Sequence, residues 1–163
     1  MHAKSWARIC IKALAGFHYG FLVRPWFRNV SRALRKEPKW YLRDWSVVTD
    51  AGARSETFVA CHLLKAVDGW TDLGLGNFEL RYVRDKEKHE VDFVVIRDKR
   101  PWFIVEVKAS DTSLSPALAY FQKALAAPHA FQAVLTLPHV RADCFERRDP
   151  TVVPARTLLA QLL

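Results

Sequence analysis

Two short apolar stretches of the chain each carry charged residues where a buried strand is normally apolar. Asp92 lies within the run Val91–Ile96, and Glu106 and Lys108 end the run that begins at Trp102. A buried charge costs free energy unless it is paired, hydrogen-bonded or bound to a metal ion. These three charges therefore mark where chemistry is most expected.

Strand geometry predicts how these side chains face. Because side chains alternate along a strand, Glu106 and Lys108 point the same way, and Asp92 shares its face with Val94 and Ile96. The short turn between the two stretches makes them antiparallel neighbours. We therefore expect Asp92 to lie close to Glu106.

A third carboxylate precedes these strands. The pattern over Ala53–Val67 is helical, and Glu56 lies on its apolar stripe. If this helix covers the face of Asp92 and Glu106, Glu56 joins them. The alternative is a surface residue that complements the helix dipole, which is common for a lone Glu in a first turn.

Three carboxylates in one dry site need a cation, because like charges a few ångströms apart raise one another's pKa. Oxygen ligands favour a hard ion, Mg²⁺ or Mn²⁺. Such an ion can polarise a phosphodiester and activate water, and Lys108 would orient that water or counter the growing charge. The set Glu56, Asp92, Glu106 and Lys108 therefore predicts a metal-dependent phosphodiester hydrolase.

The remaining pattern predicts an α/β fold with a mixed central sheet flanked by helices. The first 35 residues are predicted to form one or two helices, including the apolar stretch Ile9–Val23, with Pro25 starting the second. The other expected elements are an extended piece at Trp40–Val48, a turn at Gly69–Asn77, strands at Phe78–Val83, Val91–Arg97 and Trp102–Lys108, a fourth and fully apolar strand at Phe131–Leu137, and helices at Ser115–Ala126 and from Ala155 onward.

Length and charge limit the organisation. With 163 residues, half of them apolar, we expect one domain, made of a basic helical segment (1–45) and an α/β core (46–163). The net charge is +8, and residues 1–45 hold ten Lys and Arg against two acids. This excess favours a polyanionic partner such as nucleic acid, with an acidic membrane surface as the alternative.

Five basic residues recur at three- and four-residue steps near the N-terminus. On a helix this spacing places them on one face, which is either a solvated surface or a stripe that binds phosphates. They are Arg24, Arg28, Arg32, Arg35 and Lys39.

The three cysteines are widely spaced, so neither a disulfide framework nor a zinc site is predicted, and a cytoplasmic setting is expected. No run approaches the roughly 18 uncharged apolar residues of a membrane span. We therefore expect no membrane-spanning helix, and nucleic acid rather than a membrane as the partner.

Several motifs carry a resemblance. The order Glu56, Asp92, Glu106-Val107-Lys108 over helix, strand, strand, strand, helix and strand is similar to the PD-(D/E)XK nuclease superfamily. The segments that begin at Pro25, Lys36, Arg54 and Lys88 more closely resemble the uncharacterised nuclease-like module at the C-terminus of a prokaryotic AAA-type ATPase family. The resemblance covers about Phe17 to Leu137.

The resemblance implies a restriction-endonuclease-like core (α-β-β-β-α-β) acting as a Mg²⁺- or Mn²⁺-dependent nuclease, with DNA as the expected nucleic acid. Asp92, Glu106 and the backbone carbonyl of Val107 would hold the metal, and Glu56 would complete the site directly or through water. On the helix that follows, Tyr120 and Gln122 are either phosphate contacts or packing residues.

The resemblance also leaves a non-catalytic alternative, in which the domain binds nucleic acid or docks an ATPase. Relatives of the module follow an ATPase with a Gly-rich loop ending in Lys-Ser/Thr, and these 163 residues contain no such motif. The chain is then either a remnant of such a fusion or a stand-alone version.

Overall fold

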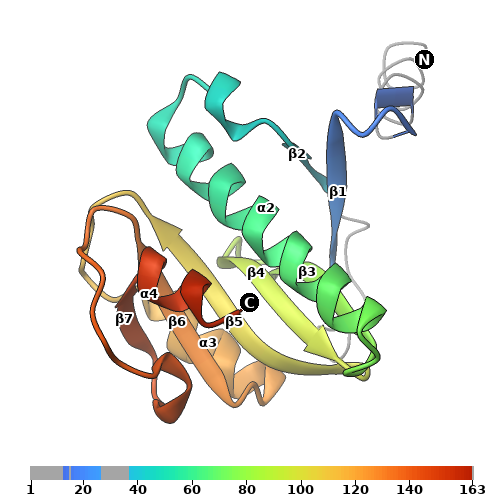
Figure 1. Ribbon diagram of the computed structural model, residues 1–163. Helices are drawn as coiled ribbons and strands as arrows, with labels where there is room; N and C mark the ends of the chain where they lie inside the picture. Colours follow the sequence, from blue (N-terminus) through green and yellow to red (C-terminus); the bar gives the residue numbers. More distant parts are fainter. Residues whose placement is uncertain (1–12, 15, 27–36, 163) are drawn as a thin grey trace.

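A seven-stranded mixed sheet forms the centre of the molecule (Figure 1). The structure is a computed structural model, and it describes residues 13, 14, 16–26 and 37–162. The strand order is β2-β1-β3-β4-β5-β6-β7; β1–β3, β5–β6 and β6–β7 are parallel pairs and the other neighbours are antiparallel. The strands are β1 (Gly20–Pro25), β2 (Lys39–Leu42), β3 (Phe78–Arg84), β4 (Glu90–Arg97), β5 (Arg100–Lys108), β6 (His129–Val134) and β7 (Thr151–Pro154).

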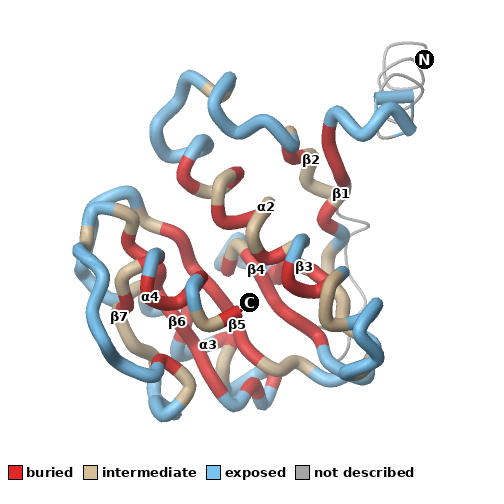
Figure 2. The backbone as a smooth tube through the Cα atoms, in the orientation of Figure 1, coloured by how far each residue is buried: buried red, intermediate tan, exposed pale blue. Residues whose placement is uncertain are grey.

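Helices cover both faces of this sheet, which confirms the predicted α/β fold with a mixed central sheet. Helices α2 (Ala51–Asp72) and α4 (Ala155–Ala160) pack on one face, and α3 (Pro116–Leu125) packs on the other. The central strands β4, β5 and β6 are buried along most of their length (Figure 2). No helix in the described part of the chain is long and apolar enough to span a bilayer.

Helix α2 is longer than predicted. Its N-terminus is capped by Asp50, whose side chain accepts from the Ala53 N–H at 2.7 Å. The apolar stripe holds the helix on the sheet through buried residues such as Leu63. The helix continues to Asp72, so the turn expected from Gly69 onward is wrong at its start, because the packed stripe outweighs the low helix propensity of one glycine.

The hairpin strands and two helices agree with the sequence prediction. Strands β3, β4 and β5 each match within one or two residues, and α3 and α4 begin at Pro116 and Ala155. Proline suits the first position of α3 because its fixed φ matches a helix and its missing N–H has no partner there.

The prediction of helices over the first 35 residues is correct at residues 13, 14 and 16, which are helical, and wrong at Gly20–Pro25. Gly20–Pro25 is strand β1, and Lys39–Leu42 is strand β2, which ends well before Val48 and is followed by a 3₁₀ turn at Trp45–Val47. Hydrogen bonding overrides the apolar pattern here, since β1 pairs with both β2 and β3. Arg24 and Lys39, the described members of the predicted basic stripe, therefore lie on two strands and not on one helical face.

The C-terminal region differs in two details. The strand predicted at Phe131–Leu137 is observed at His129–Val134, and β7 was not predicted. Strand β7 has only four residues, and its parallel pairing with β6 is a tertiary contact that leaves no local signal.

Candidate active site

Asp92 and Glu106 lie on neighbouring strands. The antiparallel register pairs Phe93 with Val105, and one further step places Asp92 opposite Glu106. The Val107 N–H donates to Asp92 Oδ2 at 2.9 Å. The structure thus brings together the two acids that the strand pattern placed near each other.

A β-bulge sets the direction of Asp92. The register between β3 and β4 shifts so that one residue, Tyr82, faces two, Asp92 and Phe93. Val91 and Val94 both belong to the core beneath α3, so strict alternation is interrupted between them. The expectation that Asp92 simply shares its face with Val94 and Ile96 is therefore wrong, because a bulge bends the strand and re-aims its side chains.

Glu106 and Lys108 form an ion pair on β5. Lys108 Nζ donates to Glu106 Oε1 at 2.8 Å, and the Glu106 side chain is only 11% exposed. This hydrogen bond raises the pKa of Lys108 above its usual value. The ammonium is therefore held in its charged form.

Glu56 lies on α2 near the site, but its contacts differ from those predicted. The helix packs on the face that presents Phe93 and Val105, whereas the alternation of β5 turns Glu106 away from that face. Glu56 Oε1 accepts from the Tyr41 hydroxyl at 2.5 Å and from Lys39 Nζ at 3.0 Å. Glu56 thus joins the other acids through residues of β2.

Lys39 links the acids, a role that the sequence reasoning missed. Its ammonium lies 2.5 Å from Glu90 Oε1, 3.0 Å from Glu56 Oε1 and 3.6 Å from Asp92 Oδ1. It also lies 5.4 Å from the centre of the Tyr82 ring, within cation–π range. The sequence placed Lys39 in a basic stripe, either solvated or phosphate-binding, apart from the acids, whereas the structure places its ammonium among them. We call Glu56, Glu90, Asp92, Glu106, Lys39 and Lys108 the acid–lysine cluster.

Burial and charge change the pKa values in this cluster. Burial raises the pKa of Asp92 to about 7, Glu56 and Glu106 add to the effect, and Lys39 and the Val107 N–H oppose it. Burial lowers the pKa of Lys39, but attraction to Glu56, Asp92 and Glu90 outweighs it and raises that pKa overall. Burial and the neighbouring Glu56 carboxylate raise the pKa of Tyr41. A nearby cation would therefore favour the charged form of Asp92.

The other predicted contacts lie outside the cluster. Tyr120 packs against the ring of His89, and the Gln122 amide donates to the Arg148 carbonyl at 2.6 Å, so both have partners within the fold. Arg24 is exposed on β1. The remaining residues of the basic stripe, Arg28, Arg32 and Arg35, lie outside the described residues.

A second acidic group lies in the β3–β4 turn. Asp85, Glu87 and His89 each offer a ligand atom within 4.8 Å of the others, and in the described ranges no other group of three acids, His or Cys meets this limit. Glu56, Asp92 and Glu106 are therefore further apart than three ligands of one ion.

Gln132 supports the loop that follows Lys108, although it stands in a strand read as fully apolar. Its Oε1 accepts from the Ser115 N–H at 2.8 Å, and its Nε2 donates to the carbonyls of Asp111 at 3.0 Å and Ser113 at 2.9 Å. It is fully buried and pairs in register with Glu106. A glutamine in an otherwise apolar stretch of sequence was the signal that could have revealed this role.

We expect Gln132→Leu to destabilise the fold by about 2–4 kcal/mol, because it leaves three polar groups of the loop without their partner. In thermal unfolding this corresponds to a fall of about 4–16 °C. Gln122→Leu is the matched control, since its one bond is exposed, and it should shift the transition little. Equal stability of the two variants would contradict the supporting role of Gln132.

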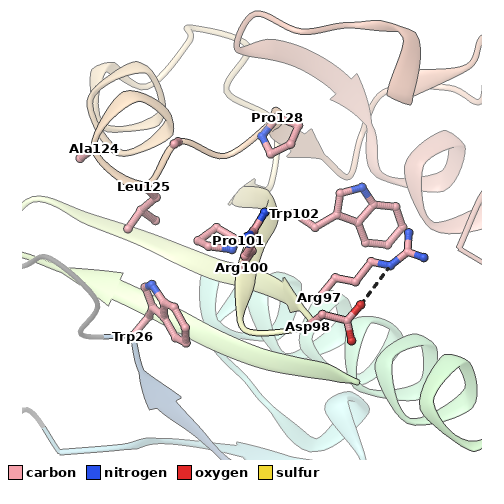
Figure 3. A pocket seen from close by; sticks show the side chains of 10 residues that line it. Trp26, Arg97, Asp98, Arg100, Pro101, Trp102, Ala124, Leu125 and Pro128 are labelled. Atoms are coloured by element: carbon pink, nitrogen blue, oxygen red, sulfur yellow. Dashed lines mark ion pairs between the residues drawn. The ribbon is translucent and has the colours of Figure 1, made fainter. Parts of the chain in front are cut away.

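A pocket of about 850 Å³ lies at the turn of the β4–β5 hairpin, at the other end of these strands from Asp92 and Glu106 (Figure 3). Its lining includes Trp26, Leu125 and the ion pair Arg97–Asp98, whose atoms are 3.9 Å apart. Arg97 and Asp92 stand at opposite ends of β4, about 16 Å apart along the strand. The pocket is therefore not part of the acid–lysine cluster.

Comparison with known proteins gives one match. The sequence model of a domain of unknown function, DUF4143, matches residues 51–158, the stretch that carries α2, β3 to β7 and α3. No curated protein and no solved structure matches the chain.

Proposed function

We propose that this chain, which belongs to the DUF4143 family of domains, is a divalent-metal-dependent phosphodiesterase acting on nucleic acid, with DNA as the substrate expected first. The observation that carries the proposal is the placement of Asp92, Glu106 and Lys108 on two adjacent strands, with Glu56 reaching the same region from α2. The resemblance of these residues to the PD-(D/E)XK pattern supports it.

The donor set fits a hard divalent ion in its chemistry, although its three carboxylates lie further apart than three direct ligands of one ion. The candidate direct ligands are the carboxylates of Asp92 and Glu106 and the Val107 carbonyl, which are the oxygen ligands that Mg²⁺ and Mn²⁺ prefer, and Glu56 would complete the site through water. Burial raises the pKa of Asp92 to about 7, as is typical of a carboxylate whose negative charge is not fully compensated, and this supports the proposal. When bound, such an ion supplies Lewis-acid polarisation of the phosphodiester and a more acidic water.

The protein's own residues would orient the reaction. Glu106 holds the Lys108 ammonium through a 2.8 Å hydrogen bond, and this side chain is still one-third exposed. Lys108 can therefore donate to a phosphate oxygen or to a water molecule next to it. The Asp92 carboxylate is held by the Val107 N–H, which fixes one of its oxygens and leaves the other facing Lys39.

The partner follows from charge. Residues 1–45 carry the excess of Lys and Arg, Arg24 is exposed, and the whole chain is at +8. A nucleic acid is the polyanion that a phosphodiesterase site would act on. The resemblance to an ATPase-linked module adds an ATPase as a second proposed partner.

A cleavage assay tests the proposal. The purified chain is incubated with plasmid DNA, linear DNA or RNA and with Mg²⁺, Mn²⁺ or EDTA. We expect cleavage that needs the divalent ion and falls at least about 100-fold in Glu106→Gln. Glu146→Gln, at an exposed position outside the cluster, is the matched control. Cleavage that survives EDTA or Glu106→Gln contradicts the proposal.

One observation favours a second candidate. Lys39 already gives positive charge to Glu56, Glu90 and Asp92, so the acids are partly neutralised without a metal ion. This arrangement suits a non-catalytic module that keeps the fold and binds nucleic acid or an ATPase. The response of the melting temperature to Mg²⁺ and Mn²⁺ distinguishes the two candidates, because only the enzyme requires a bound divalent ion.

A further inference from the structure

Lys39 occupies an unusual position among the acids. It comes from β2, at the edge of the sheet, yet its ammonium reaches Glu90 and Asp92 on β4, although β1 and β3 lie between these strands in the sheet order. Its side chain is 24% exposed, and Glu56, Glu90 and Asp92 are each 15–28% exposed. The Lys39 charge is thus shared by three half-buried carboxylates, of which Glu90 also pairs with Arg84 at 3.3 Å.

The fold holds Lys39 in this position from two sides. On β3, the Tyr82 ring lies beneath the ammonium, and the Tyr82 hydroxyl donates to the Glu37 carbonyl at 2.9 Å, two residues before Lys39. On β2, the Tyr41 hydroxyl shares Glu56 Oε1 with Lys39. Tyr82 is also the single residue that faces the bulge at Asp92, so the same side chain stands beside Lys39 and beside the bent segment of β4.

The β1–β2 pair that carries Lys39 is closely packed. A Cβ at Gly20 would lie 2.4 Å from both the Trp40 ring and the Tyr41 carbonyl, so β1 approaches β2 at a distance that only glycine allows. Gly20 is paired with Leu42, which fixes the register of the two strands. The position of the ammonium therefore depends on the pairing of these edge strands.

We propose that Lys39 is the resident counter-cation of the acid–lysine cluster, and that a divalent ion binding at Asp92 and Glu106 displaces its ammonium from Asp92. This inference rests on the proposed metal site and names its regulation. The physical reason is that an ammonium and a divalent cation repel each other strongly within a few ångströms. The Asp92 carboxylate therefore does not hold both cations in close contact at the same time. Metal loading then competes with the contacts between β2, α2 and β4.

The test compares Lys39→Met with the wild type in thermal unfolding, first in EDTA and then over a Mg²⁺ titration at constant ionic strength. In EDTA we expect Lys39→Met to unfold well below the wild type, because three carboxylates lose their shared cation. Added Mg²⁺ should restore its melting temperature, with a half-saturating concentration about tenfold or more below that of the wild type.

Two further variants keep the test interpretable. Lys39→Arg retains the charge and should match the wild type in EDTA, which separates loss of charge from loss of packing. Lys65→Met is an exposed control on α2 and should change neither measurement. If Lys39→Met is too unstable to purify without metal, it is prepared in Mg²⁺ and titrated with EDTA, and the expected midpoint shift is the same.

The outcomes distinguish this inference from the proposed function. If Mg²⁺ stabilises the wild type and Lys39→Met with the same half-saturating concentration, the proposed displacement of Lys39 is wrong. The proposed metal site would then still stand. Unchanged stability of Lys39→Met in EDTA would overturn the counter-cation role. The absence of any Mg²⁺ or Mn²⁺ response in wild type and variant alike would contradict the proposed function itself, and the displacement with it.

Discussion

Replacing Lys108 by alanine is expected to lower the rate of metal-dependent cleavage by roughly 10²- to 10⁴-fold, the range typical of losing a positioned acid–base or electrostatic group. The reason lies in its geometry. Glu106 holds the ammonium at 2.8 Å, and the side chain stays one-third exposed, so it can reach a phosphate oxygen or a water molecule. The measurement is a single-turnover cleavage time course with the substrate on which the wild type is active.

Two controls make the Lys108 result specific. Lys123→Ala, at an exposed position on α3, should cleave like the wild type. Lys108→Ala should still gain thermal stability from Mg²⁺, because the proposed ligands are oxygen atoms of other residues. An undiminished rate in Lys108→Ala would remove it from the reaction, and cleavage that disappears on further purification of that variant would identify a contaminant.

The second large effect concerns Asp92. Because burial and the neighbouring acids raise its pKa from 3.8 to about 7, the folded protein binds the proton of Asp92 more tightly than the unfolded chain does. The stabilisation linked to this proton is fully present below about pH 4 and is lost as the pH rises through 7. In EDTA we therefore expect the wild type to lose a few kcal/mol of stability between pH 5 and 8.5 relative to Asp92→Asn.

The same substitution should abolish the response to metal. At pH 8, Mg²⁺ at 100 times its Kd should stabilise the wild type by about 2.7 kcal/mol, because it binds the native state alone. Asp92→Asn keeps an acceptor oxygen for the Val107 N–H but loses the charge, so it should gain nothing. Asp98→Asn, 57% exposed at the other end of β4, is the matched control. Parallel pH curves for wild type and Asp92→Asn would contradict the proposed electrostatics.

The sequence was informative where local pattern determines structure. Asp92, Glu106 and Lys108 stood out because charges interrupt apolar strands, and the hairpin turn placed them on neighbouring strands, as observed. Helix α2 followed from its apolar stripe. These features depend on side-chain periodicity and on short-range turns, both of which are present in the sequence itself.

The remaining features depend on tertiary contacts. Strand β1 was predicted as helix because its apolar residues continue an apolar stretch, and its strand form depends on pairing with β2 and β3. The bulge at Asp92 depends on the register with β3, and Lys39 reaches Asp92 from a distant edge strand. No local spacing encodes such contacts. Gln132 is different, since a glutamine in an apolar strand was a visible signal that the apolar interpretation passed over.

The most direct test of the metal-dependent site is a crystal soaked in Mn²⁺, with diffraction recorded at the manganese absorption edge. We expect an anomalous peak between Asp92 and Glu106, next to the Val107 carbonyl, with the Lys39 ammonium withdrawn from Asp92. A crystal at millimolar Mn²⁺ with no peak at these residues, and with Lys39 still paired with Asp92, would contradict it.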